Sequence, residues 1–134
     1  MIPRHVVWVA AGAAAGSVLR AALSLVVLTA VGPGFPWGTL VVNVLGSFAI
    51  GLYAALAGPG GRWPHRAGLQ QAVMAGLCGG LTTFSIFSLE TFLMLTDGRT
   101  GLALLNIALS LTLWLAAVLL GMRAGLWLNR RVVV

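Results

Sequence analysis

One stretch decides how the chain is read: residues 76–90 are Gly-Leu-Cys-Gly-Gly-Leu-Thr-Thr-Phe-Ser-Ile-Phe-Ser-Leu-Glu. The stretch lies inside an apolar run, yet paired glycines, paired threonines and two serines interrupt it. A helix that only spans lipid has no packing need for this cluster. Because glycine leaves helical geometry at low steric cost, we expect the helix to break at Gly79 and Gly80. The break would bring backbone carbonyls, hydroxyls and aromatic edges to a buried ion.

The composition indicates an integral membrane protein. Of the 134 residues, 60% are hydrophobic and 7% are charged, with eight basic and two acidic side chains. So few charges could not keep a soluble domain of this hydrophobicity in solution. The basic residues are arginines that lie mainly at the ends of apolar segments, where they meet lipid headgroups. We therefore expect a multi-pass protein of the cell (plasma or inner) membrane, with the lipid bilayer as a partner and no nucleic acid.

Four apolar segments are long enough to cross a bilayer, which predicts an all-α integral membrane protein. We expect one domain over residues 1–134, with spans over about residues 6–31, 39–57, 67–95 and 102–120 and a basic tail after the last. The first span contains Gly12-Ala-Ala-Ala-Gly16, a small-residue face that lets another helix approach closely. Four spans place both termini on one side together with most of the arginines, and the positive-inside rule predicts that this side is cytoplasmic.

Polar residues also occur inside the other three spans. Asn43 and Ser47 lie one helical turn apart in the second span, and Asn106 and Ser110 do so in the fourth, so each pair shares a helix face. Arg20 lies past the middle of the first span, where a guanidinium costs about 2.5–3.5 kcal/mol on insertion scales. It must snorkel, pair or line a wet cavity. For Asn43, a hydrogen bond that only joins two helices and a role in an ion path both remain open.

The sequence contains no nucleophile–base pair, metal-ligand cluster or phosphate-binding loop, so we do not expect an enzyme. Buried polarity in a membrane then favours passage of a solute or ion. Carbonyl ends of a broken helix carry partial negative charge and suit a small cation such as Na⁺. A two-fold dimer would double the oxygens available to it. The alternative is a kink whose carbonyls are bonded by the hydroxyls of Thr82 and Thr83.

Two phenylalanines follow the expected break. On a helix Phe84 and Phe87 lie near one another, with Ser88 next to both. Helical spacing of this kind is typical of simple packing. The alternative uses the positive edge of the aromatic ring, which can face an anion that must shed water, while serine and asparagine donate hydrogen bonds. In that reading the segment from Phe84 to Ser88 is a pore wall.

Three patches of the sequence resemble the small fluoride channels of bacteria, the Fluc or CrcB family. They are Gly12-Ala-Ala-Ala-Gly-Ser-Val-Leu-Arg20, Gly38-Thr-Leu-Val-Val-Asn-Val-Leu-Gly-Ser-Phe-Ala-Ile-Gly51 and the stretch 76–90. They occur in the family's order and span most of the chain, and the last two are specific together.

The resemblance implies a subunit of four transmembrane helices, with the third broken, in an antiparallel dual-topology dimer with two fluoride pores. By this likeness Phe84 and Phe87 are the pore phenylalanines and Asn43 is the pore asparagine. Ser110, with Asn106, belongs to a polar track. A structural Na⁺ at the dimer centre is held by the backbone carbonyls of Gly79 and Thr82, and Arg20 makes a vestibule electropositive. Family members commonly have a tyrosine at the position of Asn106, and a serine stands where Trp114 falls.

The implied function is passive, selective efflux of F⁻ that relieves fluoride toxicity. Hydrogen fluoride enters the cell, ionises in the more alkaline cytoplasm, and the ion leaves through the channel. We expect the partner to be a second copy of the chain, and the arginine bias gives an alternative, an oppositely oriented homologue. The alternative function is a small four-helix proton-coupled exporter that uses Glu90 as its carboxylate. A non-transporting assembly protein would explain the small-residue faces but not the cluster in residues 79–84.

Overall fold

The computed structural model describes residues 4–63 and 66–130, which form helices joined by short turns. The elements are α1 (Arg4–Val31), α2 (Trp37–Ala57), α3 (Ala67–Gln71), η1 (Ala72–Cys78), α4 (Gly79–Leu81), α5 (Phe84–Thr96) and α6 (Thr100–Arg130). Within these ranges, four segments are long and apolar enough to cross a membrane: His5–Val31, Trp37–Ala57, Ala67–Thr96 and Thr100–Arg130. The predicted all-α membrane fold is confirmed. The last helix is longer than the expected span, because α6 continues through the predicted basic tail as far as Arg130.

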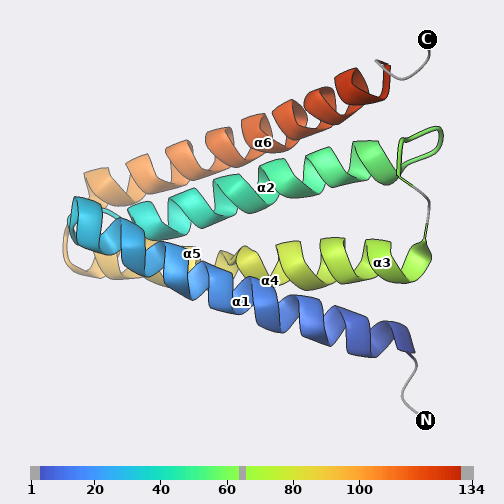
Figure 1. The fold of residues 1–134 in the computed structure, drawn as a ribbon. Helices are drawn as coiled ribbons and strands as arrows, with labels where there is room; N and C mark the ends of the chain where they lie inside the picture. Colours follow the sequence, from blue (N-terminus) through green and yellow to red (C-terminus); the bar gives the residue numbers. More distant parts are fainter. Residues whose placement is uncertain (1–3, 64–65, 131–134) are drawn as a thin grey trace.

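The helices pack in two close pairs (Figure 1), α1 against η1 and α4, and α2 against α6. Glycines bring the backbones together in both. A Cβ on Gly80 would collide with the carbonyl oxygen of Ala13, and a Cβ on Gly16 with that of Leu77. Between α2 and α6, a Cβ on Gly121 would collide with the carbonyl oxygen of Phe48. Small residues permit this approach in membranes, where van der Waals contact between helices drives association.

The third span is interrupted at Thr82 and Thr83. Gly79 is helical, with φ −64° and ψ −36°, whereas Thr82 (φ −84°, ψ 157°) and Thr83 (φ −150°, ψ 124°) are extended. The prediction of a break at the glycine pair is therefore wrong. Gly80 serves the contact with α1 instead. Threonine suits the break because its branched side chain favours extended backbone and because its hydroxyl caps the next helix: Thr83 Oγ1 accepts the Ile86 N–H at 3.2 Å.

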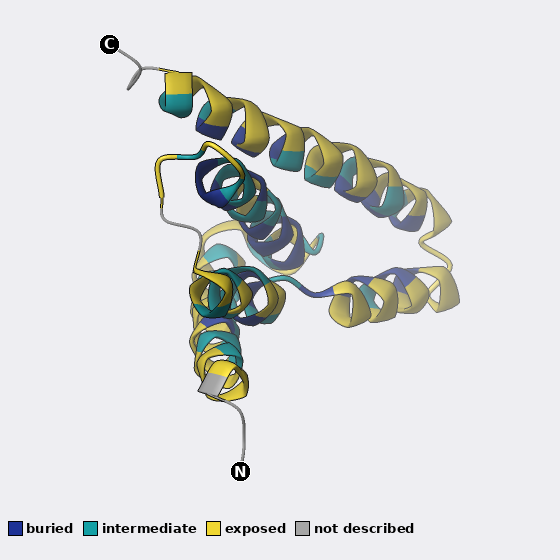
Figure 2. Ribbon diagram, turned by 90° about the vertical axis from the view of Figure 1, so that its right-hand side faces the viewer, coloured by how far each residue is buried: buried dark blue, intermediate teal, exposed yellow. Residues whose placement is uncertain are grey.

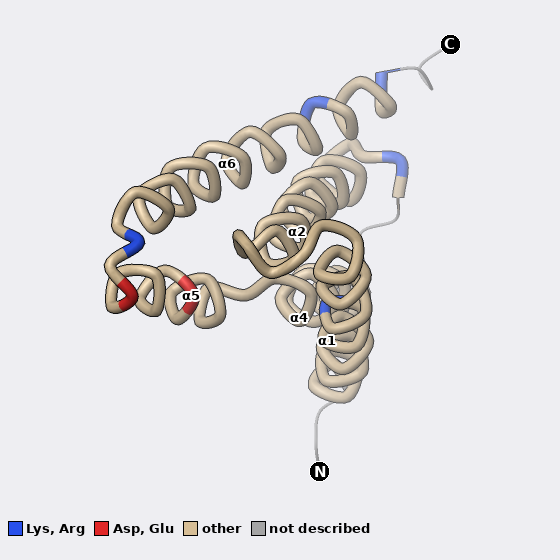
Figure 3. The backbone as a smooth tube through the Cα atoms, turned by 90° about the vertical axis from the view of Figure 1, so that its left-hand side faces the viewer, with Lys and Arg blue, Asp and Glu red and all other residues tan. Residues whose placement is uncertain are grey.

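After the break α5 leaves the side of α1 and runs next to α6. Figures 2 and 3 show it set apart from α1 and joined to α4 by a thin extended segment. Large apolar side chains on α5 are exposed, among them Leu89, Phe92 and Leu93. In the most hydropathic window of the first span, only 6% of the residues are buried. One copy of the chain thus leaves much apolar helix surface for lipid or for a partner.

Arginines mark the two ends of the helices unequally (Figure 3). The end where α1 begins and α6 finishes carries Arg123 and Arg130 on α6. The loop with Arg62 lies at the same end, since the Arg62 backbone N–H donates to Asn129 Oδ1 at 3.1 Å. At the opposite end Arg99 donates from Nη2 to the Gly34 carbonyl at 2.7 Å. This arrangement places most of the described arginines on the side of the termini, as the sequence predicts.

Candidate ion pathway

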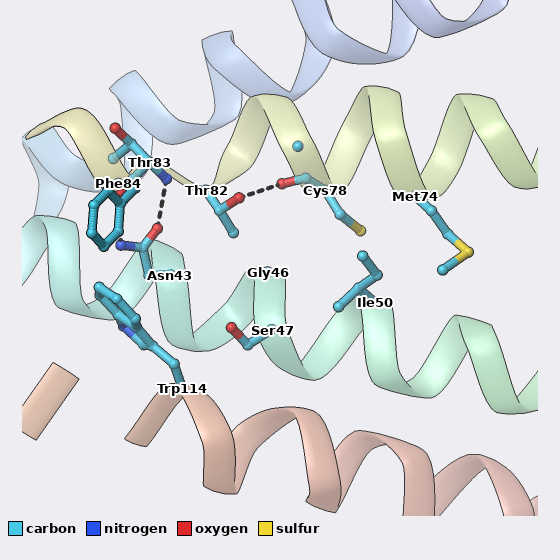
Figure 4. Close-up of a pocket in the computed structure, with 11 residues that line it drawn as sticks. Asn43, Gly46, Ser47, Ile50, Met74, Cys78, Thr82, Thr83, Phe84 and Trp114 are labelled. Carbon is cyan, nitrogen blue, oxygen red and sulfur yellow. Dashed lines mark hydrogen bonds between the residues drawn. The ribbon is translucent and has the colours of Figure 1, made fainter. Parts of the chain in front are cut away.

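A cavity of about 290 Å³ lies where the broken third span faces α2 and α6 (Figure 4). Residues that the sequence singled out line it, among them Asn43, Gly79, Thr82 and Phe84. The remaining lining residues are Gly46, Ser47, Ile50, Met74, Cys78, Thr83 and Trp114. The fold thus gathers the expected asparagine, the expected carbonyl segment and one expected phenylalanine around one space.

Asn43 holds the break in place. Its Nδ2 donates to the Thr83 carbonyl at 2.9 Å, and its Oδ1 accepts the Thr83 N–H at 2.7 Å. The side chain is buried, with 4% of its surface exposed. Because a primary amide has two N–H donors, this clamp leaves one of them for a further acceptor. Asn43 therefore both joins two helices and keeps a donor, so the two sequence readings of this residue do not exclude each other.

At the break, the N–H groups that would bond the carbonyls of Gly79 and Thr82 in a continuous helix donate to other acceptors. In a continuous helix the carbonyls of Gly79 and Thr82 would accept the N–H groups of residues 83 and 86. Here the Thr83 N–H goes to Asn43 and the Ile86 N–H goes to the Thr83 hydroxyl. The Thr82 hydroxyl donates to Cys78 at 3.0 Å. The two oxygens predicted to hold a cation are thus among the carbonyls that lose their helical donors at the break.

Arg20 reaches this segment from α1. Its Nη1 donates to the Thr82 carbonyl at 3.3 Å, and the residue is half-buried. Of the three possibilities that the sequence leaves for this arginine, the structure shows pairing with a backbone oxygen. A carbonyl oxygen has two lone pairs, so this bond leaves Thr82 one acceptor site. The guanidinium also places a positive charge next to the break.

The two phenylalanines lie together but in different surroundings. Their ring centroids are 5.5 Å apart with planes tilted by 48°. Phe84 is 69% exposed, whereas Phe87 is 6% exposed and meets Trp114 in a T-shaped contact with centroids 4.9 Å apart. Within one chain, Phe87 is therefore enclosed between α5 and α6, and Phe84 lies at the open side of the cavity.

A chain of hydrogen bonds joins α6 to α5 beside Phe87. Ser110 Oγ donates to Asn106 Oδ1 at 3.4 Å, and Asn106 Nδ2 donates to Thr91 Oγ1 at 2.9 Å. Thr91 then donates to the Phe87 carbonyl at 2.7 Å. Ser110 and Asn106 are each 1% exposed. The structure places Ser110 in this polar seam, but Ser88 lies outside it: that serine is exposed and donates to the Phe84 carbonyl of its own helix at 2.9 Å.

Sequence reasoning passed over Thr39 and Thr91, and it named Thr83 only as a hydroxyl that could bond a carbonyl of the kink. The Thr83 backbone bonds the Asn43 side chain, and the Thr83 hydroxyl caps α5. Thr91 accepts a hydrogen bond from Asn106 and so joins α5 to α6. Thr39 donates to Glu90 Oε1 at 2.9 Å, while Glu90 Oε2 is buried without a partner in the described ranges. A threonine three residues before Ile86 at a helix start was a readable capping signal. The pairings of Thr39 and Thr91 join residues on different helices, so no local pattern announces them.

The fold and the site define a class: a four-helix membrane protein whose third span is broken beside a small polar and aromatic cavity. Comparison with known proteins refines this class. A family model described as CrcB-like protein, Camphor Resistance (CrcB), matches residues 7–122. The chain belongs to this CrcB family.

Curated relatives agree over nearly the whole chain. "Fluoride-specific ion channel FluC 1" of Rhodopseudomonas palustris (strain BisB18) is 49% identical over 91% of this chain and 86% of its own. "Fluoride-specific ion channel FluC" of Opitutus terrae (strain DSM 11246 / JCM 15787 / PB90-1) is 52% identical over 91% of this chain and 92% of its own. The relative of the same name in Rhodospirillum rubrum is 45% identical over 93% of this chain and 97% of its own.

Proposed function

We propose that this chain forms a fluoride-selective, passive ion channel that lets F⁻ leave the cytoplasm across the cell membrane and so relieves fluoride toxicity. The observation that carries the proposal is the likeness to relatives named as fluoride-specific ion channels, at 45–52% identity over about nine-tenths of the chain. We do not propose an enzyme, because the curated relatives are named as ion channels.

The geometry around the break suits a small anion. Asn43 keeps one N–H donor next to Phe84, and the ring edges of Phe84 and Phe87 carry partial positive charge. Neutral donors of this kind can replace the water of an ion without holding it as tightly as a fixed cation would. Arg20 lies near the break, at the Thr82 carbonyl, and not beside Phe87. At that position its charge can attract anions into the vestibule. Ser110 would continue the path beside Phe87, whereas a pore role for Ser88 requires its hydroxyl to turn away from the Phe84 carbonyl.

The functional unit that we propose is an antiparallel dimer with dual topology. The exposed apolar surfaces of α1 and α5 would be covered in part by the second copy. Two-fold symmetry would also bring two sets of freed carbonyls from Gly79 and Thr82 to the axis. Backbone oxygens of a broken helix suit Na⁺, and the diverted donors of these two oxygens make them fit the role. When bound there, Na⁺ would hold the broken segments of the two subunits together.

The arginine distribution bears on the choice of partner. A strong bias toward one side favours a single orientation of the chain, which is the condition for pairing with an oppositely oriented homologue. We propose the homodimer, since the bias is a tendency that assembly can override. The protein should first be expressed alone, purified and cross-linked. An antiparallel dimer supports the proposal, and a pure monomer or a strictly parallel pair rejects the homodimer.

The transport experiment uses liposomes loaded with potassium fluoride and a fluoride electrode outside. We expect rapid efflux once an ionophore balances the charge, equal rates with and without a proton gradient, and no chloride efflux in parallel vesicles. The Glu90→Gln variant separates this channel from the proton-coupled alternative. An exporter would need the gradient and would lose coupling in that variant. Absence of fluoride efflux from the dimer, or efflux that requires the gradient and the Glu90 carboxylate, would contradict the channel.

A further inference from the structure

Trp114 is a polar side chain of the pathway to which no role has been assigned. It extends from α6 toward Asn43 and Phe84 and lines the same cavity (Figure 4). Its ring lies across that of Phe87, with an angle of 73° between the planes. The Nε1 atom is shielded from solvent and has no hydrogen-bond partner in residues 4–63 and 66–130. A buried donor left unpaired is costly, so the indole requires an explanation.

The position of Trp114 on α6 supplies one. Asn106, Ser110 and Trp114 follow each other at steps of four residues and so lie along one face of the helix. The hydroxyl of Ser110 donates to Asn106, and the amide of Asn106 donates to Thr91. The next donor along this face is the indole N–H, for which the described chain provides no acceptor. The polar seam between α5 and α6 therefore ends in an unused donor beside Phe87.

We propose that the Trp114 Nε1–H donates a hydrogen bond to the anion as it passes Phe87. Trp114 would then be an anion-binding group of the pore. The identity of the ion rests on the proposed function. The unpartnered N–H and its position beside Phe87 are observed in the structure and do not depend on that proposal. The indole nitrogen is a donor only, so its occupant must be an acceptor. Fluoride is the smallest halide and the strongest hydrogen-bond acceptor among them, and a neutral N–H binds it without the tight hold of a fixed cation.

Two replacements test the donor. Trp114→Phe removes the N–H together with part of the ring, and incorporation of benzothienylalanine at position 114 removes the N–H while keeping the shape. We expect both proteins to elute like the unchanged protein in size-exclusion chromatography and to carry fluoride about tenfold more slowly. Trp8→Phe is the matched control, because Trp8 is an exposed indole on α1, away from the cavity. It should transport at the unchanged rate.

A second measurement reads the hydrogen bond itself. Protein labelled with ¹⁵N in its indole groups is titrated with sodium fluoride or sodium chloride, and the Trp114 resonance is identified by its loss in Trp114→Phe. We expect fluoride, but not chloride, to move this N–H proton downfield. A resonance that fluoride leaves unmoved, or normal flux with benzothienylalanine, would overturn the proposal and leave the N–H as a packing contact with the Phe87 ring. If the unchanged protein carried no fluoride, the proposed function would fail, yet the titration would still decide whether Trp114 binds the anion.

Discussion

Two seams of this molecule are built in opposite ways. Between α1 and the α4 segment, Gly16 and Gly80 bring backbone against backbone, with no room for even one added carbon. Between α5 and α6, Phe87, Asn106 and Trp114 keep the helices farther apart with rings and hydrogen-bonding groups. The glycine seam gains dispersion contact and has no polar side chain at these approaches. The polar seam places costly groups in the membrane-spanning part of the chain, and such groups are a mark of function there.

The difference shows how one span can serve two purposes. The segment before Thr82 is fixed to α1, so it can hold the break in a constant position. The segment after Thr83 is joined to the rest through Asn43 and through the seam with α6. The segment that is packed against α1 and the segment that faces the polar seam thus meet at the extended residues Thr82 and Thr83. Three substitutions separate these roles.

The largest effect is expected from Phe87→Ile in the polar seam. Isoleucine keeps apolar volume but removes the aromatic edge, so fluoride efflux from liposomes should fall to the background leak while the dimer persists in chromatography. Phe92→Ile is the matched control, because Phe92 is an exposed phenylalanine of the same helix. Unchanged flux in Phe87→Ile would remove the aromatic edge from the pathway.

A smaller effect, on stability rather than on the ion, is expected from Gly80→Val in the glycine seam. The added side chain collides with the Ala13 carbonyl, and forced overpacking costs about 1–3 kcal/mol. Thermal unfolding in detergent should show a lowered midpoint and a reduced folded fraction. Gly79→Ala provides the comparison, because a Cβ there comes no closer than 3.9 Å to the Met74 carbonyl. Equal loss of stability in both variants would mean that close approach is not what Gly80 provides.

The smallest effect is expected from Asn106→Leu. The change removes the donor to Thr91 and the acceptor of Ser110, and such bonds between membrane helices are worth about 0.6–2 kcal/mol. The unfolding midpoint should fall slightly, and fluoride flux should drop by a few fold. Thr96→Val is a suitable control, because Thr96 is exposed and its hydroxyl donates to the Leu93 carbonyl of its own helix. A midpoint equal to that of the control would show that the bonds of Asn106 contribute no stability.

Sequence reasoning reached the membrane class, the four spans and the family, because each rests on a strong local pattern. It also named Asn43, Gly79, Thr82 and Phe84, which the fold gathers around one cavity. It placed the break at Gly79 and Gly80 instead of Thr82 and Thr83. Glycine can leave a helix at low cost, but it can also remain helical. Which pair of residues opens depends on the partners that each finds, and Asn43 meets Thr83 across 40 positions of sequence.

The sequence by itself determined that this chain crosses a membrane by four helices, because length and hydropathy suffice for that conclusion. It also determined that the polar cluster in the third span requires a reason. The tertiary structure decided how that cluster works. The helix opens at Thr82 and Thr83 because Gly80, just before them, is packed against α1. In addition, Asn43 and the Thr83 hydroxyl accept the Thr83 and Ile86 N–H groups that would otherwise have continued the helix. The result is two carbonyls without their helical donors on one side of the break, one of them bonded by Arg20, and an aromatic, hydrogen-bonding wall on the other.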